Sequence, residues 1–279
     1  MRPAIGILQG RLSPPQGSGA QFFPRDWAAE FPLAKEMGFS SITWFLDRTV
    51  PGFDPIRDIW LTTGVLAAID GARRILPIQA IDCSHLYPFF GSGAGETVRA
   101  FEPLLPPLAP RLSGAIILPM LLHNAPRTDE EMLQTRRTLE RLLAVAEPLG
   151  ARFALETEMP AAVLAEFVDS FNSPLLGVCY DLGSATTYGL DSPAEILELG
   201  SRIFEVHIKD HKRGQVVGTH PSVKLGEGDT DFIGCFKALK TLHYKGGLTM
   251  QAWRGSEYLA DAGAQLSFIN KKLDDVYGH

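Results

Sequence analysis

Short apolar runs alternate with longer helical patterns along the whole of this chain. Each short run has the length of a buried strand, and each longer segment repeats apolar residues at the spacing of an amphipathic helix. Eight strands that alternate with eight helices indicate a parallel sheet, and eight parallel units close into a barrel. We therefore predict an α/β fold that consists of a single (β/α)8 TIM barrel.

The expected elements follow from where each apolar run stops and each helical pattern begins. The strands are expected at Ala4–Leu8, Ser41–Phe45, Ile78–Cys83, Ala115–Leu118, Phe153–Glu156, Leu176–Tyr180, Ile203–Ile208 and Leu248–Gln251. The helices are expected at Asp26–Met37, Ile56–Ile75, Thr97–Leu105, Thr128–Leu149, Pro160–Phe171, Pro193–Leu199, Phe232–Leu242 and Ala260–Leu273. Thr128, followed by three acids, predicts a capped helix start.

Neither a linker nor a low-complexity tract divides the 279 residues, so we predict one domain over residues 1–279. The proline-rich stretch Pro103–Pro110 is expected to be a loop. The N-terminus lacks the apolar stretch of a signal peptide, and every apolar run falls short of the roughly 20 residues of a membrane span. These features favour a cytoplasmic protein without membrane contact. The net charge of −6 disfavours binding to nucleic acid.

Four polar residues stand at the ends of separate expected strands, namely Glu156, Asp181, His207 and Gln251. In a closed parallel barrel the carboxyl ends of the strands meet at one mouth. Two carboxylates, an imidazole and an amide oxygen suit manganese, magnesium, cobalt or zinc. Such an ion could hold adjacent oxygens of a sugar, so that a carboxylate removes a carbon-bound proton to give an enediolate. A single strand-end acid can also be only a helix cap or a partner for lysine.

Several segments of the chain carry a resemblance to a known family. They are Gly6–Pro14, Leu155–Glu156, Gly177–Gly183, Val206–Asp210 and Leu225–Phe232. On these segments the sequence resembles the xylose-isomerase-like barrel superfamily of sugar-phosphate isomerases and epimerases. Within it, the chain is most similar to the L-ribulose-5-phosphate 3-epimerase and ketose 3-epimerase group. The pattern Val-His-Ile-Lys-Asp, followed after about 15 residues by Leu-Gly-Glu-Gly-Asp, is specific to the superfamily without naming a substrate.

The resemblance implies that Glu156, Asp181 and His207 bind a divalent metal together with a glutamate on the eighth strand. Here the chain departs from the family, because Gln251 occupies that position. An amide oxygen can coordinate a cation, but an amide cannot take or deliver a proton at neutral pH. Glu156 therefore remains as the catalytic base. Another residue does the second proton transfer, or an aldose–ketose isomerisation needs only one base, or catalysis has been lost.

Other strand-end residues are candidates for substrate contact. His85 resembles a substrate-touching histidine of the epimerases, with a loop histidine as the alternative. Gln9 and Arg11 could hold a sugar hydroxyl or phosphate, or form structural ion pairs. Trp44 could wall the pocket or pack in the barrel, and Arg254 could shape the rim.

Lys209 follows His207 by two residues, so strand alternation sends both side chains to the same face. There its ammonium could stabilise an enediolate or bind an anionic substrate, and we predict a catalytic role. Asp210 then points away and is expected to orient its neighbours. The loop Gly226–Asp229 is a candidate phosphate site, with a tight turn before the next helix as the alternative.

Three functions fit these observations. The first is a metal-dependent isomerase or epimerase of a ketose or its phosphate, and the second is a sugar-binding barrel without catalysis, which Gln251 motivates. The third is a metal-dependent endonuclease for abasic sites, which shares the barrel but needs further ligands that this chain mostly lacks. The expected partner is thus a small sugar or sugar phosphate, and association into a homo-oligomer stays open.

Overall fold

The expected strands form one closed parallel barrel, in which neighbours follow chain order and β1 pairs with β8. The computed structural model describes residues 2–15, 22–46, 53–54, 56–83, 88–214 and 222–278. The strands are β1 (Ile5–Leu8), β2 (Ile42–Phe45), β3 (Ile78–Asp82), β4 (Ile116–Met120), β5 (Phe153–Thr157), β6 (Leu176–Asp181), β7 (Ile203–Ile208) and β8 (Gly247–Met250). The predicted (β/α)8 TIM barrel is therefore confirmed.

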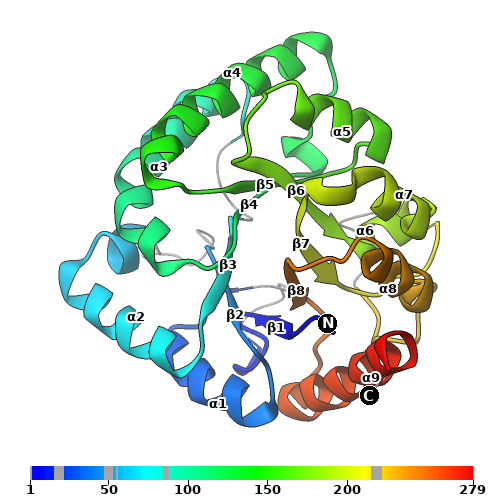
Figure 1. Cartoon of the computed structure of the whole chain (residues 1–279). Helices are drawn as coiled ribbons and strands as arrows, with labels where there is room; N and C mark the ends of the chain where they lie inside the picture. Colours follow the sequence, from blue (N-terminus) through cyan, green and yellow to red (C-terminus); the bar gives the residue numbers. More distant parts are fainter. Residues whose placement is uncertain are drawn as a thin grey trace.

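Helices form a ring around the barrel, as Figure 1 shows in a view along the barrel. They are α1 (Glu30–Met37), α2 (Thr63–Ile75), α3 (Gly93–Leu108), α4 (Asp129–Ala146), α5 (Ala161–Asp169), α6 (Leu182–Thr187), α7 (Ser192–Leu199), α8 (Phe232–Thr241) and α9 (Tyr258–Tyr277). The short α6 follows β6 directly and was not expected from the sequence. The expected helix Ile56–Ile75 is divided into a π-helical turn, Ile56–Trp60, and α2. Across the described ranges, no helix combines the length and the apolarity needed to cross a bilayer.

The proline-rich stretch is part of a helix, which corrects the loop expected there. Pro103, Pro106 and Pro107 lie inside α3, which continues to Leu108. A proline inside a helix removes a backbone hydrogen bond and costs stability. The compensation comes from side chains at helical spacing that are fully buried against the barrel, namely Phe101, Leu104, Leu105 and Leu108. Tertiary packing therefore overrides the local preference of proline.

The start of α4 is capped as predicted. The hydroxyl of Thr128 accepts a hydrogen bond from the backbone N–H of Glu131, whose carboxylate accepts one from the backbone N–H of Thr128. This reciprocal arrangement satisfies two groups that a helix start otherwise leaves unpaired.

The barrel interior is lined by small side chains with a polar network among them. Ala80, Ala115, Ile117, Ala154 and Cys179 form one buried cluster. A second part of the interior is polar, because Thr249 Oγ1 donates to Glu205 at 2.7 Å and lies 2.6 Å from Thr43 Oγ1. Strand alternation then assigns the residues two positions further along, including His207 and Gln251, to the same inward face.

Trp44 lies outside the barrel wall, in an aromatic cluster between β2 and the helices. Its ring centroid is 5.0 Å from that of Trp27 and 5.2 Å from that of Trp60, and the side chain is fully buried. Since Thr43 points into the barrel, its neighbour Trp44 must point away from it. The expectation that Trp44 walls the substrate pocket is therefore wrong, and barrel packing, the alternative, accounts for this residue.

We expect Trp44→Ala to lower the free energy of unfolding by about 3–5 kcal/mol, because it leaves a large cavity among the rings. Denaturant unfolding followed by circular dichroism measures this loss. Protein that remains folded should keep the wild-type KM for its substrate. A raised KM with unchanged stability would return Trp44 to the substrate pocket.

Candidate active site

Three of the predicted metal ligands lie together at the carboxyl ends of neighbouring strands. Glu156 is on β5, Asp181 ends β6, and His207 is on β7, where it is the register partner of Asp181. Each offers a ligand atom, and these atoms all lie within 4.8 Å of one another. All three residues are buried. The strands thus assemble a triad that could hold a metal ion.

The imidazole of His207 fits a metal ligand because neither of its ring nitrogens makes a hydrogen bond among the described residues. The side chain is fully buried. Its Nδ1 lies 3.6 Å from Glu156 Oε1, beyond hydrogen-bond length. Buried polar atoms normally have partners, since leaving them unpaired is costly. A divalent ion shared with two carboxylates would satisfy this requirement.

The charges around the triad shift the pKa values of its members. Burial by itself would lower the pKa of His207, but the carboxylate of Glu156, with those of Asp82 and Asp181, outweighs it and raises the pKa to about 9. Burial would raise the pKa of Asp181, but Lys209 and His207 outweigh it and lower that pKa. Without a metal, the site therefore holds a protonated imidazole between carboxylates, and an arriving cation must displace that proton.

Gln251, the fourth predicted ligand, is engaged on both sides of its amide. Its Oε1 accepts a hydrogen bond from Lys209 Nζ at 3.0 Å, and its Nε2 donates to Asp82 Oδ2 at 3.3 Å. Lys209 Nζ also donates to Asp181 Oδ2 at 3.4 Å. As predicted from strand alternation, the ammonium of Lys209 thus reaches the same site as His207.

Asp82 is a site residue that is absent from the predictions. It ends β3, is fully buried, and contacts Gln251 across the barrel mouth. Its signal in the sequence is the same as that of Glu156, a carboxylate directly after an apolar run. Cys83, which follows, extends the apparent apolar run beyond Asp82 and hides this signal.

The loop after β1 is held by a buried carboxylate from α1. Glu30 accepts hydrogen bonds from the backbone N–H groups of Gly10 and Leu12, at 2.8 and 3.0 Å, and from Ser13 Oγ at 2.8 Å. Gln9, at the start of this loop, accepts a hydrogen bond from the Phe45 N–H through its Oε1. Its Nε2 has no partner among the described residues, so the amide retains a donor.

The two arginines predicted near the substrate lie at this same part of the barrel mouth. Arg11 is buried, and its burial and the charge of Arg254 lower its pKa, while Glu30 and Asp82 oppose that effect. Arg254 donates a hydrogen bond to the carbonyl of Gly10 and stacks over the ring of Phe22 at 4.5 Å. Arg254 is therefore tied to the loop after β1, which also contains Arg11.

The loop Gly226–Asp229 is folded around an internal carboxylate instead of presenting free amides to a phosphate. The N–H groups of Gly226, Gly228 and Thr230 donate to Asp210, which orients this loop as expected. Asp231 then caps α8 by accepting from the Gly234 N–H. The phosphate site expected here is thus not supported, and the tight turn is the correct alternative. His85 lies outside the described residues.

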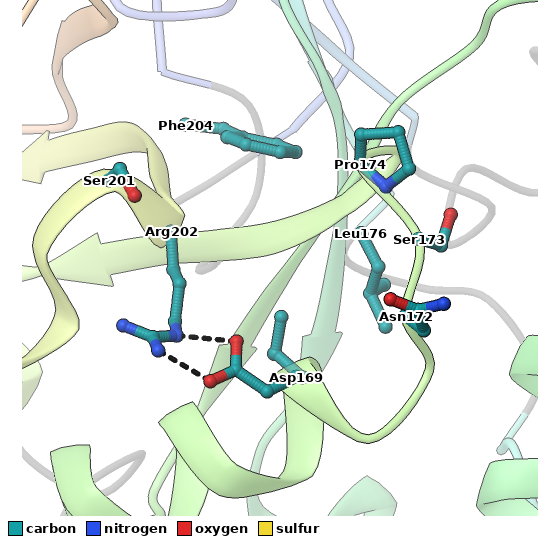
Figure 2. Close-up of a pocket in the computed structure, with 9 residues that line it drawn as sticks. Asp169, Asn172, Ser173, Pro174, Leu176, Ser201, Arg202 and Phe204 are labelled. Carbon is teal, nitrogen blue, oxygen red and sulfur yellow. Dashed lines mark hydrogen bonds and ion pairs between the residues drawn. The ribbon is translucent and has the colours of Figure 1, made fainter.

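A hollow on the surface lies at the other ends of the strands and is not part of this site. Figure 2 shows its lining, in which Asp169 and Arg202 form an ion pair, with 2.7 Å between Arg202 Nε and Asp169 Oδ1. Leu176, in the same lining, is the first residue of β6, and Arg202 directly precedes β7. The hollow therefore belongs to the amino-terminal face, which in barrels of this type contributes to stability.

Comparison with known proteins gives one family for most of the chain. The family described as xylose isomerase-like TIM barrel matches residues 31–272. An L-ribulose-5-phosphate 3-epimerase of Escherichia coli (strain SMS-3-5), UlaE, is 31% identical over 253 residues, which cover 86% of each chain. A 3-oxo-isoapionate decarboxylase of Pectobacterium atrosepticum is 32% identical over 124 residues, 42% of this chain and 43% of that one. The structure of the IOLI protein with a bound zinc atom superposes with a TM-score of 0.73 at 17% identity, covering 98% of this chain and 97% of that one, and this likeness bears on the fold alone.

We expect His207→Ala to bind metal at least about tenfold more weakly than the wild type, because the variant removes one of three ligands. The exposed His243 provides a matched control, and His243→Ala should retain the wild-type metal content. Elemental analysis after dialysis measures metal per chain. Equal retention by both variants would remove His207 from the metal site.

Metal affinity should also rise with pH. Below pH 9 the imidazole of His207 is protonated in the metal-free protein, so each bound ion releases a proton. The apparent affinity then increases by about tenfold per pH unit and levels off near pH 9. Chelator competition at pH 6.5, 7.5 and 8.5 tests this slope, and a flat profile over that range would contradict it.

Proposed function

This chain belongs to the xylose isomerase-like TIM barrel family, and we propose that it is a divalent-metal-dependent isomerase or epimerase of a ketose or ketose phosphate. Its similarity to L-ribulose-5-phosphate 3-epimerases along most of the chain identifies it as an isomerase-type enzyme. The observation that carries the proposal is the buried triad of Glu156, Asp181 and His207, with the ammonium of Lys209 beside it.

The metal in this proposal is held by the triad. When bound, a divalent cation supplies positive charge that polarises a carbonyl and acidifies the adjacent C–H bond. Manganese, magnesium, cobalt and zinc all accept such a set of two carboxylates and one imidazole. The ring nitrogens of His207 support the assignment, because neither makes a hydrogen bond among the described residues.

Glu156 is the proposed base. Its carboxylate takes the proton from the carbon next to the carbonyl, and the electron pair of the broken C–H bond becomes part of an enediolate. For an isomerisation, Glu156 returns the proton to the neighbouring carbon, and the hydroxyl proton moves between the two adjacent oxygens. For an epimerisation, a second donor delivers a proton to the opposite face of the same carbon, while Glu156 keeps the proton that it removed. Glu156 alone can serve the first route by moving one proton along one face.

Lys209 is the proposed stabiliser of the enediolate. Its Nζ is held by Asp181 and Gln251, which keeps the ammonium at the site. An ammonium in a site of low dielectric constant stabilises the negative oxygen that develops as the proton leaves. Gln9, with its unused Nε2 donor, is a proposed contact for a sugar hydroxyl, and Arg11 and Arg254 are proposed contacts for anionic groups.

A second candidate reaction is decarboxylation of a 3-oxo sugar acid. It is favoured by the similarity to the 3-oxo-isoapionate decarboxylase and by Gln251, because loss of carbon dioxide gives the same enolate without removal of a C–H proton. Such a reaction needs stabilisation of the enolate and one proton donor, and Lys209 offers both. This reaction is the second choice because the similarity covers only 42% of this chain and 43% of that relative.

We expect the wild-type protein, loaded with manganese, to exchange deuterium from solvent into a ketose or a ketose phosphate. Lys209→Met should lower the exchange rate by about a hundredfold or more with metal retained, because it removes only the ammonium. Glu156→Gln should lose both exchange and metal. Glu166→Gln, at an exposed position of α5, is the matched control and should change neither.

Nuclear magnetic resonance of the sugar measures deuterium uptake, and release of carbon dioxide is followed in the same screen with 3-oxo sugar acids. Metal binding without uptake or carbon dioxide release would favour a sugar-binding barrel without catalysis. Full activity of Glu156→Gln would remove the proposed mechanism.

A further inference from the structure

We propose that Asp82 supplies, from β3, the carboxylate that the strand-eight position lacks in this chain, and that it positions Gln251 and, through it, Lys209. The proposal rests on the proposed function for its catalytic meaning, but its structural content is independent of the substrate. Asp82 and Gln251 then form what we call the exchanged pair, in which the acid ends β3 and the amide follows β8, where the resemblance to ketose epimerases implies a glutamate.

The contacts form one continuous chain across the barrel mouth. Asp82 Oδ2 accepts from Gln251 Nε2 at 3.3 Å, and Gln251 Oε1 accepts from Lys209 Nζ at 3.0 Å. Lys209 Nζ donates further to Asp181 Oδ2 at 3.4 Å, which connects the chain to the metal triad. Asp82 and Gln251 are 169 residues apart in the sequence, so only the closed barrel brings them together.

The orientation of the Gln251 amide follows from its two neighbours. An ammonium can only donate hydrogen bonds, and an ionised carboxylate can only accept them. The carbonyl end of the amide must therefore face Lys209, and the NH2 end must face Asp82. A glutamate at position 251 would satisfy Lys209 but would face Asp82 with a second negative charge.

Burial makes this pairing specific. The exposed fraction is 0% for Asp82 and 2% for Gln251, so neither side chain exchanges its partner for solvent. Two like charges in contact at a buried position repel strongly, whereas an amide beside a carboxylate forms a hydrogen bond. The glutamine is thus the residue that the buried carboxylate of Asp82 requires, and its presence need not signal a lost function.

For catalysis, the amide of Gln251 accepts a hydrogen bond from Lys209 and so keeps the ammonium in place. Without Asp82, the amide of Gln251 loses the partner that fixes its NH2 end, and its carbonyl is no longer held toward the ammonium. Asp82 is therefore a positioning residue, and its effect is expected in kcat more than in KM.

A charge-swap cycle tests the proposal on the full-length protein. Gln251→Glu should lower the melting temperature by about 4 °C or more, because it brings two buried carboxylates together. The double variant Asp82→Asn with Gln251→Glu restores one carboxylate and one amide in contact, with their strands exchanged. Gln251→Glu should also slow deuterium uptake. The double variant should recover more than half of both decreases, in melting temperature and in the rate of deuterium uptake.

The matched control removes the same charge elsewhere. Asp275 is exposed on α9, so Asp275→Asn combined with Gln251→Glu should remain as destabilised as Gln251→Glu alone. Asp82→Asn by itself should lower kcat for deuterium uptake by about tenfold with KM and metal content near wild type. This split separates positioning of Lys209 from a purely structural hydrogen bond, which would change stability alone.

The outcomes distinguish this inference from the proposed function. A double variant that is no better than the Asp275 control, or that stays unfolded, overturns the exchanged pair, as does a Gln251→Glu variant of wild-type stability. If the wild-type protein takes up no deuterium, the proposed function fails, while the melting temperatures still decide whether Asp82 and Gln251 are coupled. Deuterium uptake without coupling between Asp82 and Gln251 would reject the exchanged pair and leave the proposed function in place.

Discussion

Closure of the sheet through the pairing of β1 with β8 is the constraint on which the site depends. A closed parallel sheet points all strand ends in one direction, so carboxylates that are far apart in the sequence meet at one mouth. Below them, the alanines and Cys179 of the interior leave room for polar side chains to lie deep in the barrel. Burial then lowers the local dielectric constant and strengthens each interaction among the charges at the mouth.

The fold and the metal triad could be predicted from the sequence because both depend on local patterns. Each strand ends where an apolar run ends, and Glu156, Asp181 and His207 are among the first polar residues at such points. The family resemblance points to the same three residues and agrees with the family that matches residues 31–272. Their roles in metal binding and proton transfer remain proposals.

The remaining parts of the site depend on contacts that no local pattern contains. Trp44 was predicted to line the pocket, but successive side chains of a strand point to opposite faces. Thr43 is the residue that points into the barrel, so Trp44 points away from it. The amides of Gly226 and Gly228 are taken by Asp210, which spacing in the sequence does not reveal. The hydrogen bond from Gln251 to Asp82 joins β8 to β3, so neither residue alone indicates the pair.

The contacts at the barrel mouth favour an amide over a carboxylate at position 251. A divalent cation would offset the two carboxylates of the triad, and Asp82 interacts electrostatically with the buried Arg11. A glutamate at position 251 would place a second buried carboxylate beside Asp82, which is costly unless another acid is removed. Epimerisation, isomerisation and decarboxylation differ in the group that delivers a proton to the product carbon. Under the proposed function, the triad supports the chemistry that these reactions share, and Gln251 marks where this chain departs from the family resemblance.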